Sequence, residues 1–366
     1  MDRRNFLKTG ALLPTAAWLP AAAFASTPIF DPREAEQWRT FEVTTRVQLL
    51  NASGVSRVWI PLPSVNESWQ RTIGNTWSGA ATRATIVTDG TYGAQMLYAE
   101  FQPGQADPVI EVTSRFATRD RGVDLSRAGN ARPLGASDYA FYTKPTESVP
   151  TDGIVRQTAL EATKGAQTDV EKARAIYEWV VVNTFRDPKT RGCGIGDIKG
   201  MLESGNLGGK CADLNALYVG LARSVGLPAR DMYGIRVAKS QFGYRSLGAG
   251  SPNITKAQHC RAEVYLDGHG WVPVDPADVR KVALEEKPQP IPIDDPVVQE
   301  VRPKLFGAWE MNWLAYNYAH DVMLPFSSGY KVPFLMYPQG ETATGRIDSL
   351  DPDNFRYGIS ARELSA

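Results

Sequence analysis

The feature that most constrains this chain is Cys211, because it stands directly before a helix whose limits can be read from the sequence. The glycine pair at 208–209 precedes the cysteine and permits a close backbone approach. Apolar residues then recur at helical spacing, at Leu214, Leu217, Tyr218, Leu221, Ala222 and Val225. Gly226 and Pro228 follow, as is usual just after a helix. The pattern predicts a thiol at the first turn of an amphipathic helix with one buried face.

A thiol at a helix start is favoured as a thiolate. The unpaired N–H groups and the positive end of the helix dipole stabilise negative charge there. Lys210 adds a positive neighbour, and Asp213 suits the first turn. The alternative is a small apolar core residue, which is how most single cysteines behave. Partners elsewhere in the chain must decide between the two interpretations.

Histidine and cysteine are scarce, which limits the possible assignments: the chain has three of each, at 259, 269, 320 and at 193, 211, 260. A cysteine nucleophile needs a base within hydrogen-bond reach, and the base needs an orienting group. His259 begins and Asp275 ends a predicted strand–turn–strand segment. These residues are the candidate base and orienting carboxylate for Cys211, and Asp278 is the alternative orienting residue.

The length of the hairpin loop decides whether His259 and Asp275 can meet. A four-residue loop would place them on opposite faces, since a one-residue slip turns every side chain over. A three-residue loop (267–269) pairs Leu266 with Gly270 and makes the two side chains diagonal neighbours, about 7–8 Å apart at Cβ. We therefore expect a loop of odd length or a bulge.

Three motifs resemble those of the transglutaminase-like superfamily. They are GKCAD (209–213) with LARSVGLPAR (221–230), HCRAEVY (259–265) and GWVPVDP (270–276). They occur in the family's order across roughly residues 160–280. The resemblance implies an α+β fold with a papain-like core, in which a nucleophile helix packs on an antiparallel sheet. It implies Cys211 as nucleophile, His259 as general base and acid, and Asp275 as orienting carboxylate.

The resemblance implies chemistry on amide bonds through a thioester. Transfer of the acyl group from the thioester to water would make the protein a peptidase or amidase. Transfer to a lysine amine would make it a protein-glutamine gamma-glutamyltransferase. Excess water favours hydrolysis. A catalytically idle scaffold for binding or assembly in the cell envelope is the other alternative, because a fold does not prove activity.

The expected partner is a protein or peptide substrate, such as a cell-envelope peptide. Residues 1–25 contain three basic residues and one acidic residue, so the rest of the neutral chain carries a formal charge of −2. That charge gives no indication of nucleic-acid binding. We expect no cofactor and no metal, because zinc-ligand spacing and an acidic calcium loop are not evident.

The oxyanion hole can be predicted only in part. The Cys211 N–H is the natural first donor. The family's second donor is an upstream side chain, and Trp179, Asn183 and the backbone of 193–194 remain open for it. The other histidines have structural interpretations: His269 as a turn residue and His320 as a hydrogen-bonded core residue.

Two further pairings are expected from the sequence. Cys193 and Cys260 are candidates for a disulfide in an oxidising compartment, which would leave Cys211 as the free thiol. Glu263 and Arg223 are expected to form buried salt bridges rather than to act in catalysis.

The chain divides into four predicted regions. Residues 1–25 resemble a twin-arginine export signal that is cleaved after Ala25, which implies a periplasmic or secreted protein with no transmembrane segment in the mature chain. Residues 36–142 read as a β-sandwich-like domain, with strands at 40–49, 56–62, 84–87, 96–101 and 109–116. Residues 154–285 form the catalytic core, with helices at 154–162 and from Asp169 as N-cap. Residues 286–366 are predicted to be a C-terminal extension that packs on the core.

Overall fold

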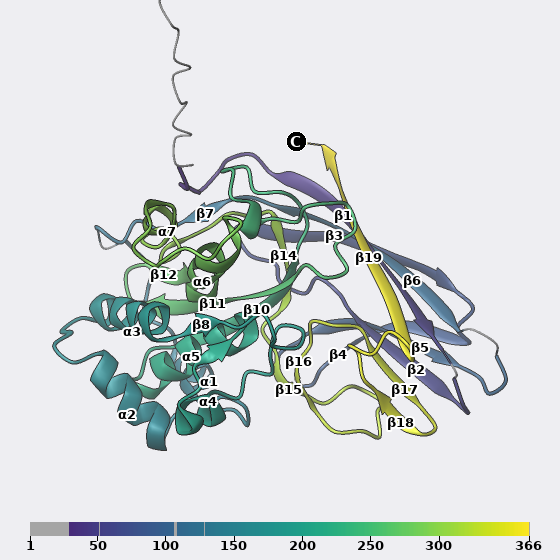
Figure 1. Cartoon of the computed structure of the whole chain (residues 1–366). Helices are drawn as coiled ribbons and strands as arrows, with labels where there is room; N and C mark the ends of the chain where they lie inside the picture. The colour runs from purple at the N-terminus through teal and green to yellow at the C-terminus, as the bar shows by residue number, and fades with distance from the viewer. Residues whose placement is uncertain (1–28, 51, 106–107, 128, 366) are drawn as a thin grey trace, which may run out of the picture.

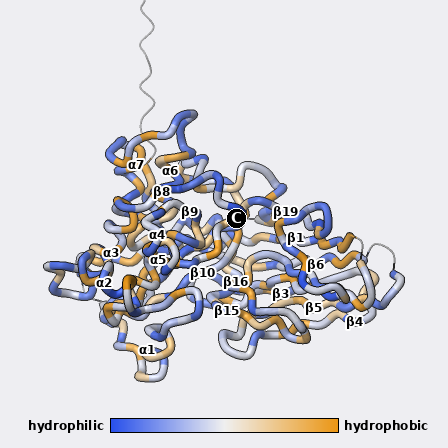
Figure 2. Tube along the Cα trace, turned by 60° about the horizontal axis from the view of Figure 1, so that its bottom comes forward, coloured by the Kyte–Doolittle hydropathy of each residue, from blue (hydrophilic) through white to orange (hydrophobic). Residues whose placement is uncertain are grey.

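The computed structural model describes residues 29–365, except residues 51, 106–107 and 128. These residues form an α+β protein in which a helical half and a β half lie side by side (Figures 1 and 2). The predicted export signal, residues 1–25, lies outside the described residues. Among the described helices, none has the length and apolar character needed to cross a membrane.

The β half consists of two antiparallel sheets, with strand orders β19-β1-β6-β3 and β18-β17-β2-β5-β4. Their bounds are β1 Arg39–Leu49, β2 Ser56–Pro61, β3 Gln70–Gly79, β4 Arg83–Thr88, β5 Gln95–Phe101, β6 Val109–Thr118, β17 Gln339–Thr342, β18 Gly345–Ile347 and β19 Phe355–Ser365. Every second residue of β1 from Phe41 onward is buried, the period of a strand with one covered face. Val47, Ile60 and Phe355 belong to one apolar cluster to which both sheets contribute. The predicted sandwich is therefore present.

The sequence predicted five strands of this sandwich, and β1, β2, β4, β5 and β6 confirm them. Strand β3 was not predicted. It lies at the edge of its sheet and most of its residues are exposed. Its sequence, QRTIGNTWSG, contains glycines and polar residues on both faces. Without a buried face there is no apolar alternation to detect.

The C-terminal segment corrects the predicted organisation, because residues 286–366 do not form one extension on the core. Strand β14 (Trp313–Asn317) joins the core sheet beside β10 (Ala229–Arg236). Strand β17 pairs with β2, and β19 pairs with β1 along its whole length. Figure 1 shows this return, with the yellow C-terminal strand beside the purple N-terminal one. Strands from both ends of the described chain thus build the sandwich. Pairing between such distant segments cannot be predicted from a local sequence pattern.

The helical half is built around one buried helix. Its sheet has the order β12-β11-β10-β14, and the added bounds are β11 Gln258–Leu266, β12 Gly270–Val274, α2 Gly153–Ala162, α3 Asp169–Asn183, α4 Ile198–Ser204, α5 Cys211–Ser224, α6 Pro276–Glu285 and α7 Pro296–Val301. Helix α5 packs on β10 and β11 on one side and on α2, α3 and α4 on the other. All of its residues are buried. The sequence predicted that only one face of α5 is buried. In the structure, neighbouring helices also cover the face that carries its polar residues.

Shorter elements complete the described fold. They are β7 Arg121–Gly122, α1 Ala136–Thr143, β8 Phe185–Arg186, β9 Gly208–Gly209, the 3-10 helix η1 Arg245–Leu247, β13 Ala308–Trp309, β15 His320–Val322 and β16 Val332–Phe334. Phe41 and Phe116 of the sandwich share an apolar cluster with Ile235 and Leu314 of the core sheet. The two halves therefore pack directly against each other through buried side chains.

The start of α3 differs by one residue from the prediction. Thr168, not Asp169, is the N-cap. Its hydroxyl accepts from the Glu171 N–H at 3.2 Å, and the Glu171 carboxylate accepts from the Thr168 N–H at 2.9 Å. This reciprocal pair is a capping box, which satisfies two backbone donors at the helix start.

The return of β19 into the sandwich predicts a large effect of truncating Phe355. This side chain is 1% exposed and lies in the apolar cluster of the two sheets. Phe355→Ala should lower the free energy of unfolding by about 3–5 kcal/mol, measured by urea denaturation. Leu364→Ala on the same strand is the control, because Leu364 is 36% exposed, and it should change stability by less than about 1 kcal/mol. Equal effects of the two substitutions would contradict the assignment of β19 to the sandwich.

Candidate active site

Cys211 is held at the start of α5 by a carboxylate in the first helical turn. Asp213 accepts hydrogen bonds from the backbone N–H groups of Lys210 at 2.9 Å and Gly196 at 3.0 Å. It thereby ties the preceding glycine-rich loop to the helix that carries the thiol. Gly194 in this loop has a φ of 92°, and an added Cβ would lie 1.8 Å from Asp213 Oδ2. Only glycine fits there.

The β11–β12 hairpin has the predicted register. Leu266 pairs with Gly270, so the loop contains three residues. This register brings the side chains of His259 and Asp275 to the same face. His259 Nε2 lies 2.8 Å from Asp275 Oδ2. The expected proximity of the two residues is therefore present, and it follows from the length of the loop.

Asp275 also organises the helices around it. It is the N-cap of α6, where its Oδ1 accepts from the Asp278 N–H at 3.0 Å. Asn215 of α5 donates to the same Oδ1 at 3.4 Å and to the Cys260 carbonyl at 2.8 Å. The Asp275 carboxylate is thus fixed by both the helix that it caps and the helix that carries Cys211.

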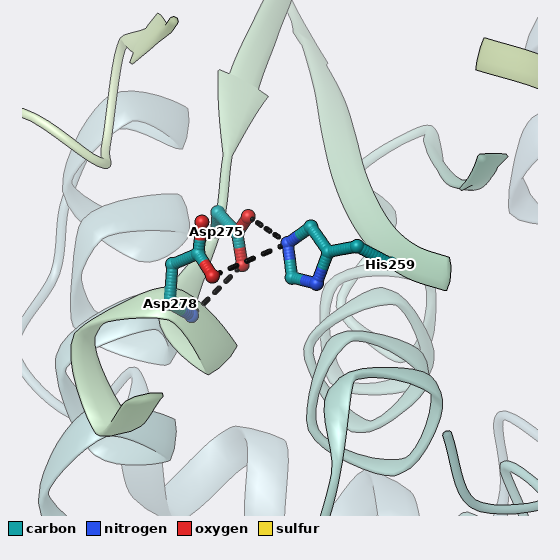
Figure 3. A group of neighbouring side chains, drawn as sticks. All are labelled: His259, Asp275 and Asp278. Atoms are coloured by element: carbon teal, nitrogen blue, oxygen red, sulfur yellow. Dashed lines mark hydrogen bonds and ion pairs between the residues drawn. The ribbon is translucent and has the colours of Figure 1, made fainter. Parts of the chain in front are cut away.

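Asp278 supplies a second carboxylate to the same imidazole nitrogen. Its Oδ1 lies 3.3 Å from His259 Nε2. Figure 3 shows both carboxylates converging on this nitrogen, whereas Nδ1 points away from them. Two guanidinium groups face the carboxylates: Arg236 lies 2.5 Å from Asp278, and Arg261 lies 3.5 Å from Asp275. Asp278, predicted as an alternative to Asp275, therefore lies beside it.

The electrostatics favour a protonated imidazole. Burial and the nearby Arg236 guanidinium both disfavour the imidazolium. Asp278 and Asp275 outweigh them and raise the pKa of His259 to about 9. Opposite charges within a few ångströms of a buried group have this effect because the surrounding dielectric is low.

The thiol of Cys211 is shifted in the complementary direction. All three cysteines are buried and free. The neighbouring Cys193 and Cys260 thiols and the His259 imidazole stabilise the Cys211 thiolate, so the pKa of Cys211 lies well below its usual range despite burial. Both shifts favour a thiolate beside an imidazolium. Cys193 and Cys260, which the sequence left open as a disulfide pair, are thiols in this structure.

Cys211 and His259 line a cleft of about 720 Å³ to which Gln258 and Tyr337 also contribute. Gln258 Nε2 is buried and has no hydrogen-bond partner among the described residues. This donor was missed by the sequence analysis, and its only local signal is a polar side chain next to the histidine. Of the candidates named from sequence, Cys193 lies in the cleft wall, whereas Asn183 Nδ2 donates to the carbonyl of Trp179 on its own helix at 2.8 Å.

Other predicted residues lie outside this cleft. His320 is buried beside Asp231, with 3.3 Å between Nε2 and a carboxylate oxygen, and His269 lies in the hairpin loop. Glu263 forms the predicted buried salt bridges, with Arg121 and with Arg230 at 2.6 Å.

The prediction of a salt bridge for Arg223 was wrong. Its Nε donates to the Ala229 carbonyl at 2.8 Å and its Nη1 to the Lys144 carbonyl at 3.3 Å. Neither partner is an acid. A guanidinium in the last turn of a helix is stabilised by carbonyl groups and by the negative end of the dipole.

The ligand atoms of His259, Asp275 and Asp278 lie within 4.8 Å of one another, a spacing that could hold a metal ion. Both carboxylates already face guanidinium groups, and the imidazole would have to be neutral to coordinate. A cation would therefore compete with Arg236, Arg261 and the imidazole proton. The donor set fits an orienting role for the imidazole better than metal coordination.

A thiol at the start of a buried helix, with an imidazole and carboxylates on the adjoining antiparallel sheet, defines a papain-like arrangement of side chains. The chain belongs to the transglutaminase-like superfamily, whose family model matches residues 156–276. It is 35% identical to an uncharacterized protein of Haemophilus influenzae over 327 residues, which cover 86% of this chain and 88% of that protein.

A solved structure shares this fold. The crystal structure of a proposed cysteine protease from Cytophaga hutchinsonii matches 90% of this chain and 92% of its own, with a TM-score of 0.57 and 12% identity. A red sea bream transglutaminase matches 88% of this chain and 61% of its own, with a TM-score of 0.31 and 12% identity. The first of these supports the α+β architecture across most of the chain.

The two pKa shifts predict the pH dependence of alkylation at Cys211. The thiolate should persist as the pH falls toward its lowered pKa, and the imidazolium should persist up to about pH 9. Iodoacetamide should therefore label Cys211 at about pH 6 at least tenfold faster than a free thiol, whose pKa is near 8.5. Mass spectrometry of the labelled peptides measures the rate.

His259→Ala should abolish this fast labelling at about pH 6, and His269→Ala should leave it unchanged. Labelling that rises only near the pKa of an ordinary thiol, or that ignores His259, would contradict the thiolate–imidazolium pair.

Proposed function

We propose that this protein is a cysteine enzyme that cleaves amide bonds through Cys211, His259 and Asp275. The observation that carries the proposal is the fixed imidazole: two carboxylates hold Nε2, while Nδ1 points away from them. The imidazole also stabilises the Cys211 thiolate. Similarity to a proposed cysteine protease supports the same class of chemistry. Asp278 assists Asp275 in orienting the ring.

In the first half of the reaction, the Cys211 thiolate attacks the amide carbonyl and forms a tetrahedral oxyanion. The His259 Nδ1 proton passes to the leaving nitrogen as the carbon–nitrogen bond breaks. An amine leaves and a thioester remains on Cys211. In the second half, neutral His259 takes a proton from water, which attacks the thioester and releases a carboxylic acid. Attack by a lysine amine instead of water would give the crosslinking product.

Two donors are proposed for the oxyanion. As the first helical residue, Cys211 has a backbone N–H without an intrahelical acceptor. Gln258 Nε2 is the second donor, because it is buried, unpartnered among the described residues and part of the cleft wall. An unpaired buried donor is unfavourable in the free protein, so a role in stabilising developing charge accounts for its presence.

The site of action is proposed to lie outside the cytoplasm. Support comes from residues 1–25, in which the RRNFLK segment resembles a twin-arginine export signal and small residues precede Ser26. A peptide of the cell envelope is then an accessible substrate. Expression of the full chain followed by fractionation tests this, with N-terminal sequencing of the processed protein: a chain that begins at Ser26 outside the cytoplasm is expected, and an unprocessed cytoplasmic chain would overturn export.

The catalytic proposal is tested with the folded chain from Ser26 onward. Labelled unfolded casein is incubated with and without a fluorescent alkylamine, and hydrolysis and amine incorporation are both measured. We expect hydrolysis that is abolished in Cys211→Ser and retained in His269→Ala, because His269 lies outside the cleft lining. Dominant amine incorporation would support the transferase instead. Lack of both reactions, together with ordinary reactivity of Cys211, would favour a binding scaffold.

Gln258→Ala should separate transition-state stabilisation from substrate binding. Removing one oxyanion donor lowers kcat by about 10²–10³ with a smaller change in KM. Gln241→Ala is the matched control, because Gln241 is exposed and lies outside the cleft lining. Steady-state kinetics on the best substrate distinguish the two. A kcat unchanged by Gln258→Ala would remove Gln258 from the oxyanion hole.

A further inference from the structure

The charge of the active-site cleft differs from that of the whole chain. The chain contains 40 basic and 40 acidic residues. The cleft lining has one acid, Glu285, against seven basic residues: Arg186, Arg191, Lys210, Arg236, Lys256, Lys281 and Arg356. The basic residues around Cys211 therefore do not follow from the average composition.

Four of the seven cations have acidic partners. Arg236 pairs with Asp278, and Arg191 pairs with Asp348. Arg186 and Lys281 share the single carboxylate of Glu285, each at 2.5 Å. These groups are held in place by protein carboxylates, and they contribute less than their full charge to the cleft.

The remaining three cations are Lys210, Lys256 and Arg356, here called the free cations. None of the three forms an ion pair with any acid in the described part of the chain. Lys210 directly precedes the thiol, Lys256 precedes the strand that carries His259, and Arg356 belongs to β19 of the sandwich. Segments from both halves of the protein thus bring unpaired positive charge to one concave site.

A single exposed lysine is usually a solvated surface residue whose pairwise attraction is about 1 kcal/mol or less. Several like charges in a hollow with low-dielectric walls act differently, because the cleft focuses their field and raises the local concentration of anions. The cleft volume of about 720 Å³ is also within the range that encloses a small ligand or a few peptide residues.

We propose that the free cations select amide substrates that carry carboxylate groups near the scissile bond, that is, acidic peptides. This inference rests on the proposed amide chemistry at Cys211. The presence of the cations in the cleft that contains Cys211 favours an anionic acyl substrate over a nucleic acid, which would need basic residues along an extended face.

Alkylation kinetics test the charge selection without any turnover. Iodoacetate is an anion and iodoacetamide is neutral, so the ratio of their rates at Cys211 reports the local potential. The ratio is divided by that of a neutral model thiol, N-acetylcysteine amide, which cancels intrinsic reactivity. We expect a normalised ratio of at least about three at low ionic strength that falls toward one in about 0.5 M NaCl.

Matched variants distinguish the effect of charge in the cleft from the effect of the overall charge of the protein. The triple substitution Lys210→Gln, Lys256→Gln and Arg356→Gln should bring the normalised ratio to about one. The control triple Arg46→Gln, Arg132→Gln and Lys164→Gln removes the same charge from exposed positions outside the cleft lining. It should leave the ratio unchanged. A ratio near one in the unsubstituted protein, or equal losses in both triples, would overturn the proposal.

A binding experiment completes the test and needs no reactive thiol. Cys211→Ser is titrated with a fluorescent hexapeptide rich in glutamate and with its glutamine counterpart. At low salt the acidic peptide should bind at least about tenfold more tightly, and the free-cation triple should remove the difference. Equal binding of the two peptides would overturn acidic selection. If the protein prefers the acidic peptide but hydrolyses no amide, the cleft still selects anionic ligands, and the proposed amide-cleaving function is rejected.

Discussion

The contacts of Asp275 connect the local folding of this protein to its site. One oxygen of the carboxylate caps α6 and accepts from Asn215 of α5, and the other oxygen holds His259. The start of one helix, the side chain of another and a strand residue are thereby fixed by a single group. Because a cap must lie at the helix start, Asp275 has little freedom to move. Its hydrogen bond to His259 therefore restricts the imidazole as well. The imidazole is positioned as a consequence of secondary structure.

The surrounding charges are too buried to be explained as stabilising salt bridges. Arg236, His259, Arg261, Asp275 and Asp278 are each no more than 3% exposed. Removing such ions from water costs several kcal/mol apiece, and their attraction often does no more than offset that cost. Loss of any one partner would leave an uncompensated buried charge, at about 3–5 kcal/mol. The main effect of these charges is to fix the imidazole and to favour its protonated form, rather than to stabilise the fold.

The sequence predicted the hairpin correctly because the alternation of side chains along a strand is a local rule. A strand alternates with period two, so requiring His259 and Asp275 on one face selected a three-residue loop, which the structure contains. Sequence reasoning failed where the environment of a side chain is set only by the folded structure. Nothing near Arg223 indicates that its guanidinium binds carbonyl groups, and nothing near Gln258 marks its amide as buried and unpaired. The capping box at Thr168 was within reach of the sequence, because Glu171 stands three residues later.

The pairing of β19 with β1 is the part of the fold that a local pattern cannot contain, and it bears directly on the site. Arg356 and Tyr357 of β19 line the cleft with Cys211, whereas the same strand is hydrogen-bonded to β1 at the start of the described chain. The cleft wall therefore exists only when β1 and β19 are assembled in the sandwich. Loop-closure entropy must be overcome before such a contact stabilises anything. The wall thus depends on a long-range contact, while the thiol, imidazole and carboxylates are positioned within the core alone.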